Sequence, residues 1–208
     1  MRRIIIMFIA SIIYLTNLSA QSYLYDKGSS GASLGVTRIS GQYVLSLDMC
    51  YKGRFGVGAS AYKISDYDHV VGINGTFNFV KENSGDNVFS LPITFGYFNN
   101  GYKALGASLY NKTKVSKNFA LAIGLNYSRL FISKNSEFYS KNKNFPPISV
   151  NTLSLDIVFL YKVFKVGPSI NWSKNTNLNF GISVGVALGH NAIFSEVEEE
   201  NIEPDNEP

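Results

Sequence analysis

The sequence is poor in the residues that build catalytic and metal centres. Its 208 residues include one cysteine, Cys50, and two histidines, and charged side chains make up only 16% of the chain. A single thiol cannot close an internal disulfide, and no spacing of histidine, cysteine and carboxylate residues suits a metal site. There is no phosphate-binding glycine loop, nucleophile elbow or zinc-protease motif. We therefore expect no catalytic residue, metal or cofactor, and we predict a non-enzymatic protein that does not bind nucleic acid.

Long apolar runs are also missing after residue 20. No later segment reaches 18 consecutive apolar residues, as a transmembrane helix would. The first twenty residues instead combine two arginines, a short apolar stretch (4–15) and a small-residue cleavage site (18–20). This order is typical of a secretory signal peptide, and the apolar stretch is too short for a membrane anchor. We predict that residues 1–20 are removed and that the mature chain begins at Gln21.

The chain is rich in aromatic residues, which make up 14% of it, and in glycine, with 18 residues. Apolar and small or polar residues alternate strictly through long stretches, for example from Phe119 to Tyr127 and from Leu178 to Leu188. Such alternation is typical of β-strands with one apolar and one polar face. Turn residues separate the stretches. We predict about ten strands, at 31–39, 42–52, 54–64, 69–81, 87–98, 102–112, 117–132, 148–163, 165–174 and 177–194.

Alternation alone does not say whether the apolar face points inward or outward. Several stretches exceed the five or six residues of an ordinary strand and are long enough to cross a bilayer. Their polar faces carry mostly Gly, Ser, Ala, Thr and Asn, which suit a narrow barrel interior better than a water-facing surface. We therefore predict that residues 21–194 form an all-β fold: a single closed antiparallel up-and-down transmembrane β-barrel of about 10 strands, with 8 or 12 possible. A soluble secreted barrel that binds an apolar ligand inside is the alternative.

Aromatic residues gather near the predicted strand ends. Aromatic side chains favour the two interfaces of a membrane, and they also favour strands in general. We interpret this set as two interfacial girdles: Tyr43, Tyr51, Phe55, Tyr97, Phe98, Tyr102, Phe119, Tyr127, Tyr161, Phe164 and Trp172.

With these strands, and with a last strand that ends in the stretch from Gly185 to the aromatic Phe194, the chain resembles the small outer-membrane β-barrel superfamily of Gram-negative bacteria. The resemblance implies an outer-membrane location, contact with the lipid bilayer and with the barrel-assembly machinery, and both termini in the periplasm. The longest connection, 133–147, would then face outward. Fourteen residues follow Phe194, where members of the superfamily commonly end.

Two carboxylates fall on the polar face in mid-strand, Asp48 and Asp156. In a barrel they would point into the lumen, and Lys52 and Arg54 share that parity. We expect these four residues to be luminal charges that pair with one another and help to fill the barrel. A cation-selective path and a catalytic acid pair are the alternatives.

The end of the chain is strongly acidic. Residues 195–208 hold seven of the fifteen acidic residues and no basic one, whereas residues 21–194 hold 17 basic and 8 acidic residues. We predict a disordered tail that either stays solvated, docks on a basic rim of Lys52, Arg54, Lys162 and Lys165, or binds a periplasmic partner. For the whole chain we expect a structural, surface-exposed or envelope-complex role. The alternatives are a narrow pore for small solutes or ions and a subunit of a secretion or motility assembly.

Overall fold

A computed structural model describes the chain at residues 22–39, 42–63, 69–99, 102–132, 149–173 and 176–189. A short 3-10 helix, η2 (Ser22–Leu24), precedes ten strands. Within these residues no helix is long and apolar enough to cross a bilayer. The strands are β1 (Gly31–Ile39), β2 (Gln42–Tyr51), β3 (Phe55–Lys63), β4 (His69–Ser84), β5 (Asn87–Phe98), β6 (Tyr102–Ser116), β7 (Phe119–Ile132), β8 (Ser149–Tyr161), β9 (Phe164–Ser173) and β10 (Thr176–Leu188).

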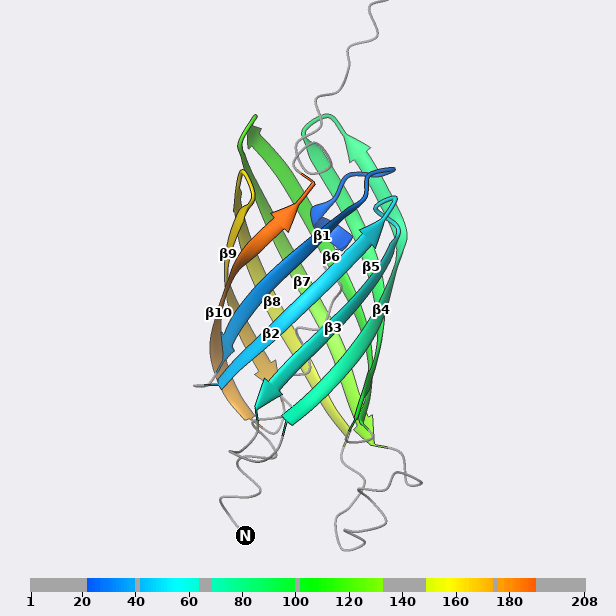
Figure 1. Cartoon of the computed structure of the whole chain (residues 1–208), viewed down its shortest axis with the longest axis vertical. Coiled ribbons are helices and arrows are strands. Elements are labelled where there is room, and N and C mark those ends of the chain that lie inside the picture. The colour runs from blue at the N-terminus through cyan, green and yellow to red at the C-terminus, as the bar shows by residue number, and fades with distance from the viewer. Residues whose placement is uncertain are drawn as a thin grey trace, which may run out of the picture.

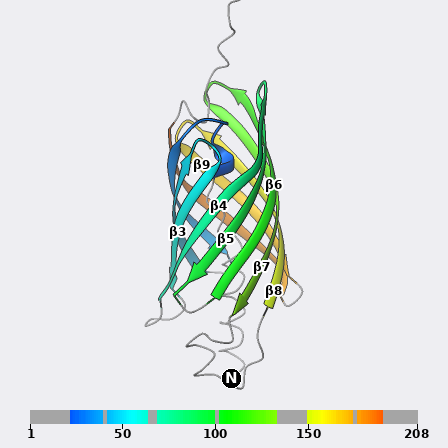
Figure 2. The ribbon, with the colours of Figure 1, turned by 90° about the vertical axis from the view of Figure 1, so that its right-hand side faces the viewer.

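The strands form one closed barrel in which each strand pairs with its neighbours in the sequence (Figures 1 and 2). The first and last strands close the ring through antiparallel pairs from Ala32 with Leu188 to Ile39 with Gly181. All other neighbouring pairs are antiparallel as well. The predicted all-β fold, a closed up-and-down barrel of ten strands, is confirmed. Strand bounds differ from the prediction by a few residues: β6 extends to Ser116, and the turn before β9 falls at 162–163 instead of 164.

The apolar face of the sheet points outward. Most of the large apolar side chains on this face are between 36% and 68% exposed, including three neighbours across the sheet, Leu109, Leu125 and Leu155. Serine, threonine, asparagine and alanine make up about half of the buried strand side chains between them, and valine and leucine make up much of the rest. An exposed apolar band around a closed polar interior is the pattern of a transmembrane barrel. The alternative of a soluble barrel with an apolar interior does not fit this arrangement.

The structure places the aromatic residues of the predicted girdles on the outer face, with two corrections. Tyr51, Phe55, Tyr161 and Phe164 are exposed near one end of the barrel, and Tyr43, Tyr97 and Trp172 are exposed nearer the other. The predictions for Phe98 and Tyr102 are wrong, because both side chains are at most 2% exposed. They lie on the interior parity of β5 and β6, where the ring of Phe98 fills the space beside Gly72.

The two ends of the barrel differ in their connections. Four tight turns, at 52–54, 85–86, 117–118 and 162–163, lie at one end, which we call the turn end. The start of β1 and the end of β10 lie there too. The other end, which we call the loop end, carries the longest connection, 133–148, whose predicted outward-facing loop lies outside the described residues. Short turns at the end where the sheet begins and ends, opposite a longer loop, are the asymmetry of outer-membrane barrels, in which the turn end faces the periplasm.

The outward apolar band makes a depth-dependent prediction. We expect Leu125→Arg, near the middle of β7, to lower the free energy of unfolding from lipid by about 2–4 kcal/mol, because it places a charge at mid-bilayer. Leu188→Arg, at the turn end, is the matched control, with an expected cost of about 0–1 kcal/mol. Urea titration of the protein refolded into phospholipid vesicles measures both values. Equal costs for the two variants would contradict a lipid-facing band.

Candidate functional site

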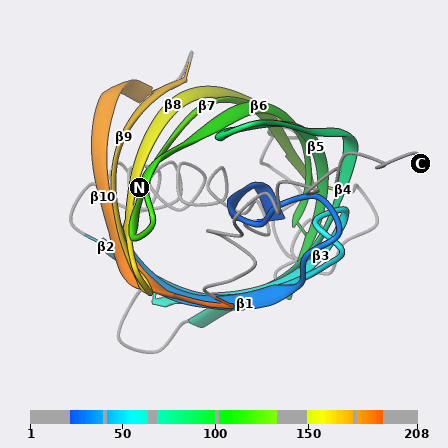
Figure 3. The same cartoon turned by 90° about the horizontal axis from the view of Figure 1, so that it is seen from above.

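The segment that precedes β1 lies inside the barrel. Seen along the barrel, η2 sits within the ring of strands at the turn end (Figure 3). Every residue from Ser22 to Asp26 is at most 4% exposed, although none of them belongs to the sheet. We call residues 22–30 the N-terminal plug. Its first five residues are buried inside the turn-end mouth of the barrel.

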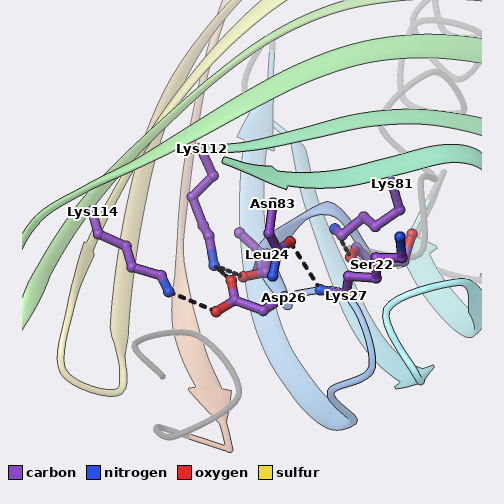
Figure 4. Close-up of polar contacts among 8 residues, drawn as sticks. All are labelled: Ser22, Leu24, Asp26, Lys27, Lys81, Asn83, Lys112 and Lys114. Atoms are coloured by element: carbon purple, nitrogen blue, oxygen red, sulfur yellow. Dashed lines mark hydrogen bonds and ion pairs between the residues drawn. The ribbon is translucent and has the colours of Figure 1, made fainter. Parts of the chain in front are cut away.

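One carboxylate of the plug is held by two lysines of β6. The Asp26 Oδ1 atom lies 2.6 Å from Lys112 Nζ, and its Oδ2 atom lies 2.7 Å from Lys114 Nζ (Figure 4). The Lys112 ammonium also donates to the backbone oxygen of Leu24 at 2.8 Å. The side chains of Asp26 and Lys112 are almost completely buried, so that this ion pair is shielded from water. Removing one partner of such a pair is strongly destabilising.

A second set of contacts comes from β4. The Lys81 ammonium donates to the Ser22 backbone oxygen at 3.0 Å, and the Asn78 amide donates to Ser22 Oγ at 2.8 Å. The same amide reaches the Gly53 backbone oxygen at 2.6 Å. Because Asn78 joins the plug to the turn between β2 and β3, one buried side chain fixes both segments.

A bulge in β4 explains why Lys81 points inward. The pairing of β4 with β5 shifts by one residue between Asn78 and Val80. Before the shift, even-numbered residues such as Asn78 are buried, whereas beyond it the buried residue is Lys81. A bulge inserts one residue and so exchanges the two faces of a strand. Strict alternation through β4 places Lys81 on the outside, so the sequence does not predict it as a luminal charge.

The outer half of the plug is fastened to the rim. The backbone N–H of Lys27 donates to Asn83 Oδ1 at 3.2 Å, and that of Gly28 donates to the Lys52 backbone oxygen at 3.1 Å. The Lys52 N–H donates in turn to Ser30 Oγ at 2.9 Å. These bonds fix the chain where it leaves the lumen and enters β1.

Deeper in the lumen, the plug stacks on a tyrosine of the wall. The rings of Tyr23 and Tyr110 lie parallel, with centroids 3.7 Å apart. The Tyr110 hydroxyl donates to Asp156 Oδ2 at 2.9 Å, and the Asn126 amide donates to the same oxygen at 2.7 Å. Burial raises the pKa of the Tyr23 phenol well above its ordinary value, so that the plug's ring stays neutral. Asp156 therefore orients the surface against which the plug packs.

Glycines provide the space for these rings. A Cβ atom on Gly124 would overlap the ring of Tyr110, and one on Gly31 would overlap the ring of Tyr25. Gly53 adopts a φ of +64°, and a Cβ atom there would overlap the Asp26 backbone oxygen. Each position therefore requires the absence of a side chain because the plug or its partner lies against it.

The four residues proposed as luminal charges occupy two different places. Asp48 is 5% exposed inside the barrel, where Lys165 is its attracting basic neighbour, and Asp156 lies against Tyr110. Lys52 and Arg54 belong to the turn between β2 and β3 and are exposed, with Lys52 Nζ 5.4 Å from the centre of the Tyr51 ring. The structure brings neither of them to the two carboxylates.

One of the four residues expected on the basic rim lies inside the barrel. Lys162 lies in the turn between β8 and β9 and is exposed, whereas Lys165 is 3% exposed inside the barrel. The prediction that Lys165 lies on the rim is therefore wrong, since β9 begins one residue earlier than expected and turns this side chain inward. Among the described residues no group of histidine, cysteine and carboxylate side chains is arranged to hold a metal.

Because lipid-facing apolar side chains surround a closed antiparallel sheet with a polar inside, the chain has the fold of an outer-membrane β-barrel. It matches no protein-family model and no curated protein.

Solved structures that it resembles include the KdgM porin in complex with disordered oligogalacturonate, at 8% identity over 76% of this chain and 97% of that one, with a TM-score of 0.38. Another is the N-terminal β-barrel domain of Pseudomonas aeruginosa OprF, at 10% identity over 77% of this chain and 98% of that one, with a TM-score of 0.33. A third is Ail, the attachment invasion locus protein of Yersinia pestis, at 14% identity, 76% and 92% coverage and a TM-score of 0.25. The similarity is one of barrel fold at low identity.

The glycine beside Tyr110 gives a prediction for the plug. Gly124→Ala forces the Tyr110 ring away from its stack on Tyr23, and overpacking of this kind costs about 1–3 kcal/mol. We expect the temperature at which the folded band disappears in heat-modifiable electrophoresis to fall. Gly75→Ala is the matched control, because a Cβ atom there meets nothing within 4 Å. If the two variants lose the folded band at the same temperature, the stack does not contribute to stability.

Proposed function

We propose that this protein is a non-enzymatic outer-membrane barrel that is closed at its periplasmic end and has a structural or surface-exposed role. The plug is the observation that supports this function. Five consecutive buried residues, 22–26, occupy the turn-end mouth and are held there by Lys81, Lys112 and Lys114. Ten strands form a narrow barrel, and open solute channels typically use sixteen or more.

The position of the plug agrees with export through a signal peptide. If residues 1–20 are removed as predicted, a single residue, Gln21, precedes the buried Ser22. The plug is then the mature amino terminus. Export also explains the proposed contact with the barrel-assembly machinery, which would act before the plug enters the lumen.

The acidic tail, residues 195–208, lies outside the described residues. Its negative charge supports a proposed contact with basic groups at the turn end. It follows β10, which ends at the turn end, where Lys27, Lys52, Arg54, Lys117 and Lys162 are exposed. A solvated tail remains the simplest arrangement, because exposed ion pairs contribute only about 0–1 kcal/mol each. A periplasmic partner that binds this tail is part of the proposal.

A closed barrel is not expected to conduct ions. We expect the wild-type protein, inserted in a planar lipid bilayer, to give no stepwise conductance, because the plug fills the mouth. A variant without two of its holding groups, Tyr23→Ala with Asp26→Ala, is expected to give stepwise openings. Stable single-channel steps from the wild-type protein would refute the closed barrel and favour the narrow pore.

A further inference from the structure

Three lysines of the barrel wall and one carboxylate of the plug meet at the turn-end mouth. The lysines that reach the plug, Lys81, Lys112 and Lys114, belong to the barrel wall, whereas the carboxylate that meets two of them belongs to the plug. Asp26 is therefore a negative charge of the plug that two lysines of the wall bind. In this respect it occupies the position of a bound ligand.

The three ammonium groups reach backbone and carboxylate oxygens of the plug. Lys112 contacts the Asp26 carboxylate and the Leu24 backbone oxygen, and Lys81 contacts the Ser22 backbone oxygen (Figure 4). Lys114 contacts the second carboxylate oxygen. Ammonium groups that converge on one carboxylate from adjacent inward positions of a strand are the usual means of binding a carboxylate or a phosphate.

The site is built into the wall and shielded from water. The side chains of Lys112, Lys114 and Asp26 are 0%, 10% and 2% exposed. Charge interactions are stronger in such surroundings than on a surface. The slight exposure of Lys114 places one edge of the site nearest to the aqueous rim.

We propose that Lys112 and Lys114 form a binding site for a small carboxylate or phosphate anion, and that Asp26 of the plug is its built-in occupant. This proposal rests on the closed barrel proposed above. It identifies the class of anion that competes with Asp26 for the two lysines. An anion that takes the place of Asp26 satisfies the same two ammonium groups and releases the plug. Lys81 then adds a third positive charge to the open mouth.

Chemical rescue tests the site directly. Asp26→Ala keeps the Cβ atom and removes only the carboxylate, so that formate has the size of the missing group. We expect Asp26→Ala to lower the midpoint of heat-modifiable conversion, and about 200 mM sodium formate to raise it by at least about 3 °C relative to sodium chloride at equal ionic strength. Asp26→Asn is the matched control, because its amide fills the space and formate should not act.

Three outcomes would overturn the proposal: formate fails to raise the midpoint of Asp26→Ala, it raises that of Asp26→Asn equally, or it acts equally when Lys112→Gln and Lys114→Gln accompany Asp26→Ala. A silent wild-type bilayer recording together with failed rescue would remove the anion site and leave the closed barrel. Wild-type conductance together with successful rescue would refute the closed barrel and leave the anion site.

A second measurement keeps the native Asp26. In a Cys50→Ser background, Ser22→Cys places a thiol at a buried plug position, and Ser30→Cys places one at an exposed position of the same segment. Inorganic phosphate should accelerate labelling of the Ser22→Cys thiol by a small maleimide at least about threefold over chloride of equal ionic strength. The Ser30→Cys thiol should react equally in both salts. Equal labelling of the Ser22→Cys thiol in both salts would overturn displacement of Asp26.

Discussion

The orientation of the strands' apolar face determines the rest of this structure. Leu109, Leu125 and Leu155 lie side by side on the outside, so the stabilisation that a soluble domain obtains from a buried apolar core comes here from lipid. The closed ring also pairs the backbone of every strand with two neighbours, which a bilayer requires because it offers no hydrogen-bond partners. The period-two pattern of the sequence predicts the strands, and the small and polar residues that alternate with the apolar ones indicate which face points outward.

An outward apolar face leaves polar side chains to fill a narrow lumen, and each of them needs a partner. The protein meets this requirement partly with residues that are not in the sheet. The plug brings backbone oxygens and one carboxylate to Lys81 and Lys112, and a ring to Tyr110, whose hydroxyl is held by Asp156. Burying a lysine without such acceptors is costly. The plug therefore supplies acceptors for the inward lysines, and the lysines hold the plug inside the barrel.

The strands could be predicted from the sequence because alternation is a local property. The strands and their order follow from it, and the side that faces lipid follows from the length of the strands and from the small and polar residues on their other face. The plug could not, since residues 22–30 have no periodicity and their position depends on contacts with strands more than fifty residues away. Lys81 was missed because the bulge after Asn78 reverses parity without a clear sequence signal. Lys114 was missed because β6 continues past its predicted end at 112, and Lys165 was placed on the rim because β9 begins earlier than predicted.

The short distance along the chain between Asp26 and β1 determines how strongly Asp26 competes with a free anion for the lysines. Only four residues separate Asp26 from the first residue of β1, so the carboxylate stays near the lysines even when it is displaced. A group tethered by a short segment acts at an effective concentration in the millimolar range. A free monovalent anion must therefore exceed this local concentration or bind more tightly. A multivalent anion has the advantage, because it can contact Lys112 and Lys114 and also reach Lys81, whose present partner is only a neutral backbone oxygen. The same tether returns the plug when the anion leaves, so closure is the state to which the barrel reverts.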